Sequence, residues 1–495
     1  MEFSEFILLH DADDIASLAL QRDRLCADVP DWDLALSTLQ ARRKLRSKLP
    51  SWYALPSLHY PLPLSAEQCS SEETALYKAS LLIELVGARG FMRSPERPAE
   101  AGSEGLIGWE PQGDIRGAEP PASIHGRHSF RNTTPAPASS SKMGKNEDKE
   151  LENCFPSSNL AQNEDAICVA DLTGGLGVDV WAFSRACEKV LYNEMKPELV
   201  EAARHNFKEL GVENVEIRNS VVEKGSVKKV LDGFQPDVIF LDPARRDDVG
   251  RKVFMLEDCS PNVLELLPEL YEACPRIMLK LSPMADITAM CRQLAGVKEV
   301  HVVEADGECK ELLLMLENGY EGTPGMYLYA NGSEAQIRRS SRRMTEEVSR
   351  RMTEGTSMAV PCHFDQAERV EKSHVLFMPG KGLMKTGAFW WPETFGLRQM
   401  AASSHMYVGS VKVPELEPFG KFYNIVETAP LSNRSIKEFG KKYPVADVTA
   451  RNIPMTSDEL RKRLGVKPSD GTVHIFGTKG ADEGRLLIAG VICKY

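Results

Sequence analysis

Three glycines and a carboxylate stand close together near the middle of the chain. Asp171 follows a short apolar run at residues 167–170, and Gly174, Gly175 and Gly177 come soon after it. The run is typical of the end of a buried strand, and the residues after the glycines are typical of the first turns of a helix. Glycines at such a junction let the backbone turn sharply and approach a ligand closely. The pattern predicts a phosphate- or nucleoside-facing corner of a doubly wound α/β sheet, although a plain strand-to-helix turn would also contain such glycines.

Two further acidic residues favour a nucleoside site over a plain turn. Glu194 lies 20 residues after Gly174, at the end of the next apolar run, where a carboxylate meets ribose hydroxyls in this fold class. Asp242 follows the apolar run 238–241 and begins the sequence Asp-Pro-Ala-Arg. Asp171 also distinguishes this pattern from dinucleotide-binding folds of the G-x-G-x-x-G type, which carry no acidic residue just before the glycines.

The segments that must position these residues alternate between short apolar runs and helical patterns. The expected strands are residues 167–170, 189–192, 215–218, 238–241 and 276–279. Helical spacing is found at residues 199–210 and 263–271. Two last apolar runs joined by a turn, at residues 300–304 and 311–317, predict a terminal hairpin. Six or seven strands in this alternation predict an α/β fold with a doubly wound sheet.

Length, charge and cysteine content narrow the class of protein. The chain has 495 residues, of which 42% are apolar, and a formal net charge of −11. This charge excludes a uniformly basic surface, so any nucleic-acid site must be a local patch. The 11 cysteines include no Cys-x-x-Cys pair, which favours reduced thiols and a cytoplasmic location and predicts no metal site. The apolar stretch at residues 6–9 is too short for a signal peptide or a membrane span.

The regions outside the expected sheet differ from it in composition. Residues 1–86 show helical apolar spacing, with Ser70 and Ser71 placed to cap a helix. Residues 87–165 are rich in Pro, Gly, Ser and Ala, which predicts a disordered linker or insertion, or else a tail that folds on a partner. From residue 361 to the end, 19 Lys and Arg residues face 14 Asp and Glu residues, a net charge of +5.

Three features of the C-terminal half are compatible with nucleic-acid binding. Ser457 is placed to cap a short helix that displays Arg461, Lys462 and Arg463, and a basic helix in an α+β module suits contact with an RNA backbone. The aromatic residues at 389–391 could stack bases, although core packing is the simpler interpretation. The basic run at 338–343 is either a solvated helical insertion or an RNA-phosphate contact.

Six short motifs occur together in this chain and carry a resemblance to a known family. They are Glu-Gln-Cys-Ser-Ser-Glu at 67–72, Asp-Leu-Thr-Gly-Gly at 171–175, Asp-Pro-Ala-Arg-Arg at 242–246, Lys-Leu-Ser-Pro-Met at 280–284, Gly-Glu-Cys-Lys-Glu at 307–311 and Arg-Asn-Ile-Pro at 451–454. The chain resembles class I S-adenosylmethionine-dependent methyltransferases. In particular, it resembles a Bacteroidetes family that joins such a domain to a ferredoxin-like domain and a C-terminal THUMP-like domain.

The resemblance implies a Rossmann-like class I methyltransferase fold. That fold has a seven-stranded, doubly wound sheet with a terminal antiparallel hairpin, here joined to an N-terminal helical region and small C-terminal α+β domains. The implied domains are a helical region at 1–86, a linker or insertion at 87–165, a methyltransferase domain at 166–318, a ferredoxin-like domain at 319–440 with an insertion near 330–360, and a THUMP-like domain at 441–495.

The same resemblance implies S-adenosylmethionine as cofactor and assigns residues to the site. The implied cofactor-binding residues are Asp171, Thr173, Gly174, Gly175, Gly177, Glu194 and Asn219. Glu194 would bind the ribose, and Asn219, which follows the third expected strand, would face the adenine. The implied catalytic residues are Asp242, Pro243 and Arg245, where amino-methyltransferases carry Asp/Asn-Pro-Pro-aromatic. Arg245 departs from that pattern, and a guanidinium can stack on a base or hold a phosphate.

The expected methyl acceptor is a base nitrogen of RNA, either tRNA or rRNA, because THUMP modules in other proteins bind tRNA. Carbon-5 uridine chemistry would need a cysteine nucleophile after the fifth strand, and this chain has Lys-Leu-Ser-Pro at 280–283 instead. Lys280 either pairs with Asp242 or Glu308 or contacts the substrate. Two alternatives stay open. One is a methyltransferase that acts on DNA, protein or a small molecule, and the other is a non-catalytic RNA-binding protein.

Overall fold

A computed structural model describes residues 1–91, 167–244, 256–338, 374–469, 471–480 and 484–493. Arg245, most of the expected linker at 87–165 and most of the basic run at 338–343 lie outside these ranges. The chain divides into two units, one of residues 1–80 with 167–495 and the other of residues 81–166. In the second unit the structure describes only the end of helix α7 (Glu72–Phe91), which continues past the expected limit at residue 86.

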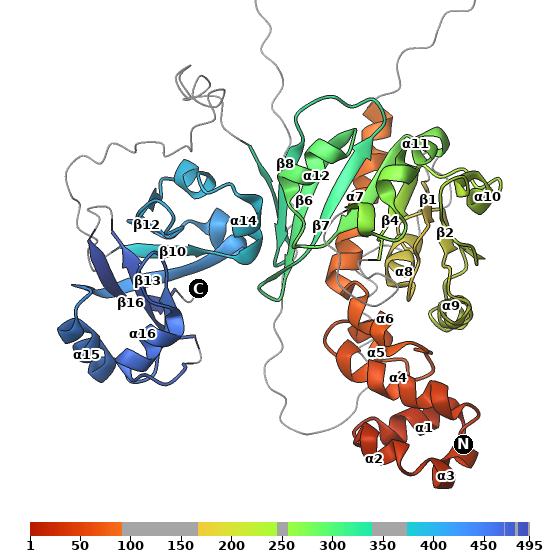
Figure 1. The fold of residues 1–495 in the computed structure, drawn as a ribbon, viewed down its shortest axis with the longest axis horizontal. Helices are drawn as coiled ribbons and strands as arrows, with labels where there is room; N and C mark the ends of the chain where they lie inside the picture. The colour runs from red at the N-terminus through yellow and green to blue at the C-terminus, as the bar shows by residue number, and fades with distance from the viewer. Residues whose placement is uncertain (92–166, 245–255, 339–373, 470, 481–483, 494–495) are drawn as a thin grey trace, which may run out of the picture. The chain divides into compact units, whose positions relative to one another are not determined.

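The larger sheet has nine strands among the described residues, in the order β3-β2-β1-β4-β5-β7-β6-β8-β9 (Figure 1). The strands are β1 (Cys168–Asp171), β2 (Lys189–Asn193), β3 (Val215–Arg218), β4 (Val238–Leu241), β5 (Arg276–Leu281), β6 (Val297–Ala305), β7 (Glu308–Glu317), β8 (Gly325–Ala330) and β9 (Ser333–Ile337). Strands β1 to β5 pair in parallel, and β7 runs antiparallel between β5 and β6. The predicted fold class, a doubly wound α/β sheet with a terminal antiparallel hairpin, is confirmed.

Two strands extend this sheet beyond the seven expected. β8 pairs in parallel with β6, and β9 pairs antiparallel with β8. Leu328 and Ala330 of β8 are fully buried and belong to the same apolar core as Val300 and Val302 of β6. Burial of these side chains holds β8 against the sheet. The domain boundary expected at residue 318 is therefore not a boundary of this sheet.

Helices cover both faces of the larger sheet, and β4 shows why. All four of its residues are buried, and successive side chains along a strand point to opposite faces. Ile239 and Leu241 share a core with Leu266 of α11, whereas the Phe240 ring meets the Phe183 ring of α8 edge-on, with centroids 5.2 Å apart. The helices around this sheet are α8 (Val178–Ser184), α9 (Pro197–Glu209), α10 (Val227–Leu231), α11 (Val263–Ala273) and α12 (Ile287–Gln293).

The N-terminal region is helical, as predicted. Its helices are α1 (Phe3–His10), α2 (Ile15–Ala19), α3 (Arg22–Leu25), α4 (Trp32–Leu45), α5 (Pro50–Tyr53), α6 (Pro63–Gln68) and the start of α7. Phe6, Trp32 and Leu39 form a small core of their own. Asn206 of α9 ties this region to the sheet, since its side chain accepts a hydrogen bond from the His59 amide at 2.8 Å and donates one to the His59 carbonyl at 2.9 Å.

A second sheet has seven strands among the described residues, in the order β11-β12-β10-β13-β16-β15-β14. The strands are β10 (Val375–Pro379), β11 (Arg398–Gln399), β12 (Tyr407–Gly409), β13 (Gly420–Pro430), β14 (Asp447–Ala450), β15 (Val473–Lys479) and β16 (Arg485–Ile492). β13 pairs with β10 on one side and with β16 on the other. The boundary expected at residue 440 therefore separates elements of one continuous sheet.

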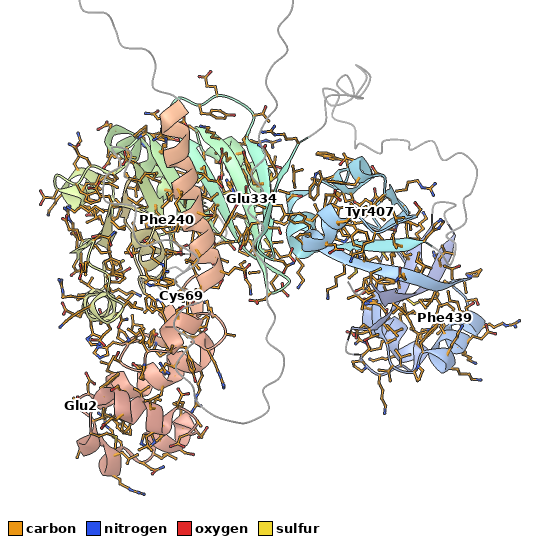
Figure 2. The ribbon with its side chains drawn as sticks, turned by 180° about the vertical axis from the view of Figure 1, so that it is seen from behind. Glu2, Cys69, Phe240, Glu334, Tyr407 and Phe439 are labelled. Atoms are coloured by element: carbon orange, nitrogen blue, oxygen red, sulfur yellow. The ribbon has the colours of Figure 1, made fainter. Side chains whose placement is uncertain are left out.

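Helices α15 (Asn433–Lys442) and α16 (Ser457–Leu464) pack on the second sheet, whereas α14 (Lys381–Thr386) follows β10 and lies against the larger sheet, where the Gly382 amide donates to Glu304 of β6. Phe439 of α15 packs in one core with Leu464 of α16 and Ile475 of β15 (Figure 2). The cap of α16 differs from the prediction. Thr456, not Ser457, accepts a hydrogen bond from the Glu459 amide, and Glu459 bonds back to complete a capping box.

Within the described ranges, none of the helices combines the length and the apolar character needed to cross a membrane.

Candidate active site

The glycine-rich turn joins β1 to α8, and its three glycines have different environments. A Cβ atom at Gly174 would lie 2.3 Å from the Tyr192 ring, and one at Gly177 would lie 2.8 Å from the Phe207 ring. Those two glycines make room for aromatic packing behind the turn. Gly175 has a φ of +53°, and a Cβ there would meet only the Thr173 carbonyl oxygen, at 3.8 Å. Gly175 is therefore the position of the three at which the backbone is open to a ligand.

Glu194 lies directly beside this open position. One of its carboxylate oxygens accepts a hydrogen bond from the Gly175 amide and the other accepts one from the Lys196 amide, each at 2.9 Å. The residue is 8% exposed. Two backbone donors thus orient the carboxylate across the turn, and each oxygen keeps a second lone pair for a ligand hydroxyl.

Asn219 supports Glu194 from the neighbouring strand end. Its side-chain amide group donates to the carbonyl oxygens of Glu194, at 2.7 Å, and Met195, at 3.1 Å. Both donor hydrogens are used by the backbone, so only the amide oxygen could face an adenine. The predicted adenine contact is thus limited to accepting a hydrogen bond.

Asp171 and Thr173 connect the glycine-rich turn to the Asp242 turn. One Asp171 oxygen accepts from the Thr173 amide at 2.8 Å and from the Thr173 hydroxyl at 3.3 Å. The same hydroxyl accepts from the Asp242 amide at 2.7 Å. Burial, together with the nearby Asp179 and Asp242 carboxylates, raises the pKa of Asp171 well above its ordinary value. A cationic ligand group at this edge would favour the ionised carboxylate.

Lys280, at the end of β5, pairs with Asp242. Its ammonium lies 2.6 Å from an Asp242 carboxylate oxygen. Glu308, the other expected partner, pairs with Lys381 instead. Burial by itself lowers the pKa of Lys280, but Asp242, Asp179 and Glu311 outweigh it and raise that pKa above the ordinary value. Lys280 is therefore a buried cation whose ammonium pairs with the Asp242 carboxylate.

Four side chains that the sequence reasoning did not place in the site surround Lys280. They are Ser70, Lys78, Asp179 and Glu311, each less than one-tenth exposed. Lys78 of α7 lies 2.6 Å from Glu311 of β7 and 3.1 Å from Asp179 of α8. Although burial opposes ionisation, Lys78 and Lys280 together lower the pKa of Asp179. We call these four residues with Lys280 and Asp242 the Lys280 network.

A sequence signal for the Lys280 network existed but was weak. Lys78 stands between apolar residues of a helical pattern, and Asp179 stands between two valines. A charged residue on an apolar face must be paired, since burying an isolated ion is costly. Ser70 and Ser71 were both predicted as possible caps of α7. The structure confirms Ser71, whose hydroxyl accepts from the Thr74 amide at 3.3 Å, whereas the Ser70 hydroxyl bonds to Asp179.

The turn after β4 is anchored at its far end. The Ala244 amide donates to the Ser260 carbonyl at 2.7 Å, and the Ser260 amide donates back at 3.1 Å. Pro243 is buried and Asp242 is half-buried, so the carboxylate is the group of this pair that can reach a ligand. Arg245 lies outside the described residues, and its predicted role stays a prediction.

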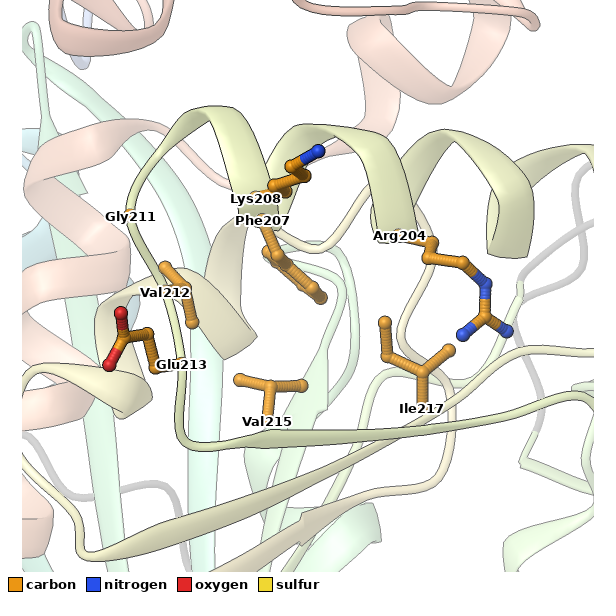
Figure 3. A pocket seen from close by; sticks show the side chains of 8 residues that line it. All are labelled: Arg204, Phe207, Lys208, Gly211, Val212, Glu213, Val215 and Ile217. Atoms are coloured by element: carbon orange, nitrogen blue, oxygen red, sulfur yellow. The ribbon is translucent and has the colours of Figure 1, made fainter.

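Elsewhere on the same sheet, a cavity of about 220 Å³ lies between α9 and β3 (Figure 3). Its lining residues are Arg204, Phe207, Lys208, Gly211, Val212, Glu213, Val215 and Ile217. None of these is a predicted site residue. Among the side chains that the structure describes, no group of three or more His, Cys, Asp or Glu residues is arranged to hold a metal ion.

Comparison with family models places a known module in the second sheet. Residues 420–490 match the family described as THUMP domain-like. The match runs from the start of β13 into β16, so it begins before the predicted range of 441–495. A comparison with curated proteins finds no match.

Comparison with solved structures includes a match over nearly the full length of the chain. A protein from Porphyromonas gingivalis W83, described as a candidate methyltransferase, matches with a TM-score of 0.66 and 23% identity, covering 99% of this chain and 98% of that one. An rRNA methylase from Streptococcus thermophilus matches at 15% identity over 31% of this chain and 86% of its own, with a TM-score of 0.23. TrmK from M. capricolum, solved with S-adenosylhomocysteine, matches at 9% identity over 31% of this chain and 62% of its own, with a TM-score of 0.24.

The full-length match shows that the two chains share a fold. This protein has a Rossmann-like sheet with a terminal antiparallel hairpin, an N-terminal helical region and a second sheet that contains a THUMP-like domain.

Proposed function

We propose that this protein is an S-adenosylmethionine-dependent methyltransferase that methylates a base nitrogen of RNA, either tRNA or rRNA. One observation carries the proposal. Asp171, Glu194 and the open Gly175 stand at the carboxyl edge of the larger sheet, where Glu194 bonds to Gly175 and the Thr173 hydroxyl links Asp171 to the Asp242 turn. In doubly wound sheets, ligands bind at this edge.

The residues at this edge fit the chemical groups of the proposed cofactor. Glu194 has free lone pairs for the two ribose hydroxyls, and Gly175 has no side chain to exclude the nucleoside. Asp171 is buried with a raised pKa, so a positively charged group nearby would relieve an unfavourable charge. When bound, S-adenosylmethionine supplies a methyl group already activated by its sulfonium, so alignment is the protein's main task.

The Asp242 carboxylate supports a nitrogen acceptor. One of its oxygens accepts a hydrogen bond from Lys280 at 2.6 Å, and carboxylate oxygens have further lone pairs for another donor. An amine of a base can therefore donate to Asp242 and present its nitrogen lone pair to the methyl group. Arg245, three residues further on, could stack on the base or hold a phosphate.

Basic residues on the THUMP-like domain support RNA as the substrate. Lys437 and Lys441 of α15 and Lys462 of α16 are exposed. No carboxylate of the described residues lies within 4.0 Å of their ammonium groups. Gly440 brings the two helices close, because a Cβ atom there would lie 1.9 Å from the Leu464 carbonyl oxygen. Unpaired lysines on adjacent helices suit contacts with successive phosphates. Action on RNA inside the cell also agrees with the expected cytoplasmic location.

The decisive experiment measures methyl transfer from labelled S-adenosylmethionine to total RNA from a strain that lacks the gene. We expect label in one RNA size class, removable by RNase. Label that resists RNase would assign the activity to DNA or protein. Absence of both label and cofactor binding by calorimetry would overturn the proposal in favour of a non-catalytic RNA-binding protein.

A further inference from the structure

The Lys280 network connects the N-terminal helical region to the Asp242 turn. Ser70 precedes α7 and Lys78 lies within it, so both come from outside the Rossmann-like sheet. We infer that Ser70 and Lys78 are positioning residues that act through Lys280, keeping its ammonium on the Asp242 carboxylate during the reaction. This inference rests on the proposed function. It assigns part of the active site to a region that the methyltransferase fold does not supply.

The distances divide the charges of the network into two groups. Lys78 lies 2.6 Å from Glu311 and 3.1 Å from Asp179. Lys280 lies 3.9 Å and 4.0 Å from the same two carboxylates, but only 2.6 Å from Asp242. Lys78 thus neutralises the carboxylates of Asp179 and Glu311, and Lys280 remains available for the carboxylate of Asp242.

Removal of the Lys78 ammonium would upset this division. Lys280 would become the only cation of the network facing three carboxylates, two of them more deeply buried than Asp242. Attraction between charges is stronger where water is excluded. The Lys280 ammonium would therefore move toward Asp179 and Glu311, and Asp242 would lose its partner.

Ser70 fixes the two ammonium groups relative to each other. Its hydroxyl donates its single hydrogen to Asp179 at 2.9 Å, and it accepts from Lys78 at 3.0 Å and from Lys280 at 3.1 Å. A serine hydroxyl has one donor and two acceptor sites, so this one is fully occupied. Ser70 is 4% exposed, and it therefore serves as an internal support rather than as a nucleophile.

The test compares Lys78→Met with the charge-balanced double variant Lys78→Met/Glu311→Gln. We expect kcat for methyl transfer to fall about tenfold to hundredfold in Lys78→Met, because an Asp242 carboxylate that has lost its Lys280 partner no longer aligns the acceptor. KM for RNA and the Kd for S-adenosylmethionine should stay unchanged, since neither the THUMP-like domain nor Glu194 is touched. The double variant has the same net charge in the network as the wild type, and most of kcat should return.

Arg42→Met is the matched control. Arg42 is a buried cation of the same helical region, 2% exposed, and its guanidinium is bonded to Asp11 and to the Leu55 carbonyl. Its loss should lower stability without the kcat-specific defect. A kcat defect of equal size in Arg42→Met, or none in a folded Lys78→Met, would overturn the inference. If Lys78→Met does not fold, kcat for methyl transfer is measured instead in Ser70→Ala and in the double variant.

A crystal structure of Lys78→Met, or of Ser70→Ala if needed, separates this inference from the proposed function. Lys280 displaced from Asp242 would support the network even if the wild type methylates no RNA. A Lys280–Asp242 distance unchanged from 2.6 Å would overturn it even if the wild type proves to be an RNA methyltransferase.

Discussion

The two halves of the candidate site are built differently. In the half around Glu194, the carboxylate is held by backbone amides of Gly175 and Lys196, which lie within 19 residues of it. In the Lys280 network, side chains as far apart as Lys78 and Glu311 hold one another by charge. The first half depends on the local path of one turn. The second half depends on the assembly of the helical region with the sheet, so it should be the more sensitive to changes far from the ligand.

The largest expected effect is at Asp242, where the two halves meet. Asp242→Ala should lower methyl transfer by roughly 10²–10⁴-fold, because it removes the group that accepts the acceptor's proton or hydrogen bond. Cofactor affinity, measured by calorimetry, should stay near that of the wild type, because the Thr173 hydroxyl bonds to the Asp242 amide and not to its side chain. If Asp242→Ala lowered cofactor affinity as much as activity, the two halves of the site would not have separate roles in cofactor binding and methyl transfer.

Glu194→Ala should show the opposite pattern. It removes charge-assisted hydrogen bonds worth roughly 1.5–3 kcal/mol, so the Kd for S-adenosylmethionine should rise roughly tenfold to a hundredfold. At saturating cofactor, kcat should fall much less than in Asp242→Ala. An unchanged Kd in isothermal titration would remove Glu194 from the cofactor site.

Gly174→Ala and Gly175→Ala test the glycine-rich turn itself. At Gly174 a methyl group would lie 2.3 Å from the Tyr192 ring, so overpacking should cost roughly 1–3 kcal/mol of folding free energy. At Gly175 the cost in folding free energy should be only about 1 kcal/mol, because of the positive φ. Cofactor affinity should fall more in Gly175→Ala than in Gly174→Ala. Thermal unfolding and calorimetry on both variants would show whether stability and binding separate in this way.

The smallest effect concerns the free energy of unfolding at Asp171. Its folded-state pKa is raised by burial, so the unfolded chain releases this proton at lower pH than the folded protein does. Stability therefore falls as pH rises from the unfolded pKa of about 4 to the folded one. Asp171→Asn should remove this loss and make the free protein more stable than the wild type at pH values above the unfolded pKa. The same variant should bind S-adenosylmethionine more weakly. A lower unfolding temperature than the wild type at pH 7 would contradict this account.

The half around Glu194 could be predicted because its residues follow one another along the chain. Each expected strand from β1 to β5 overlaps the observed one, and β3 and β4 coincide with their predicted ranges. Residues at the ends of parallel strands share one edge of the sheet. The strand pattern alone therefore brings Asp171, Glu194, Asn219 and Asp242 together.

The Lys280 network could not be predicted in the same way, because no periodicity links residue 78 to residue 311. Of the roles left open for Lys280, the structure shows pairing with Asp242 and not with Glu308. Ser70 was assigned to the wrong role, since hydroxyl side chains before a helix cap it far more often than they bond to buried lysines. The added strands β8 and β9 were missed because residues 319 to 337 follow an already complete seven-stranded pattern.

The second sheet limits how this chain can be divided into fragments. The THUMP-like segment begins at residue 420, yet β13 pairs along one side with β10, which lies upstream of that point. A fragment cut at residue 420 would expose an unpaired strand edge together with the apolar rings of Phe422 and Tyr423, which are at most 3% exposed in the whole protein. Bare edges of this kind recruit other strands and aggregate. For expression of the THUMP-like part by itself, the soluble fragment should therefore start ahead of Val375 and not at the first residue of the family match.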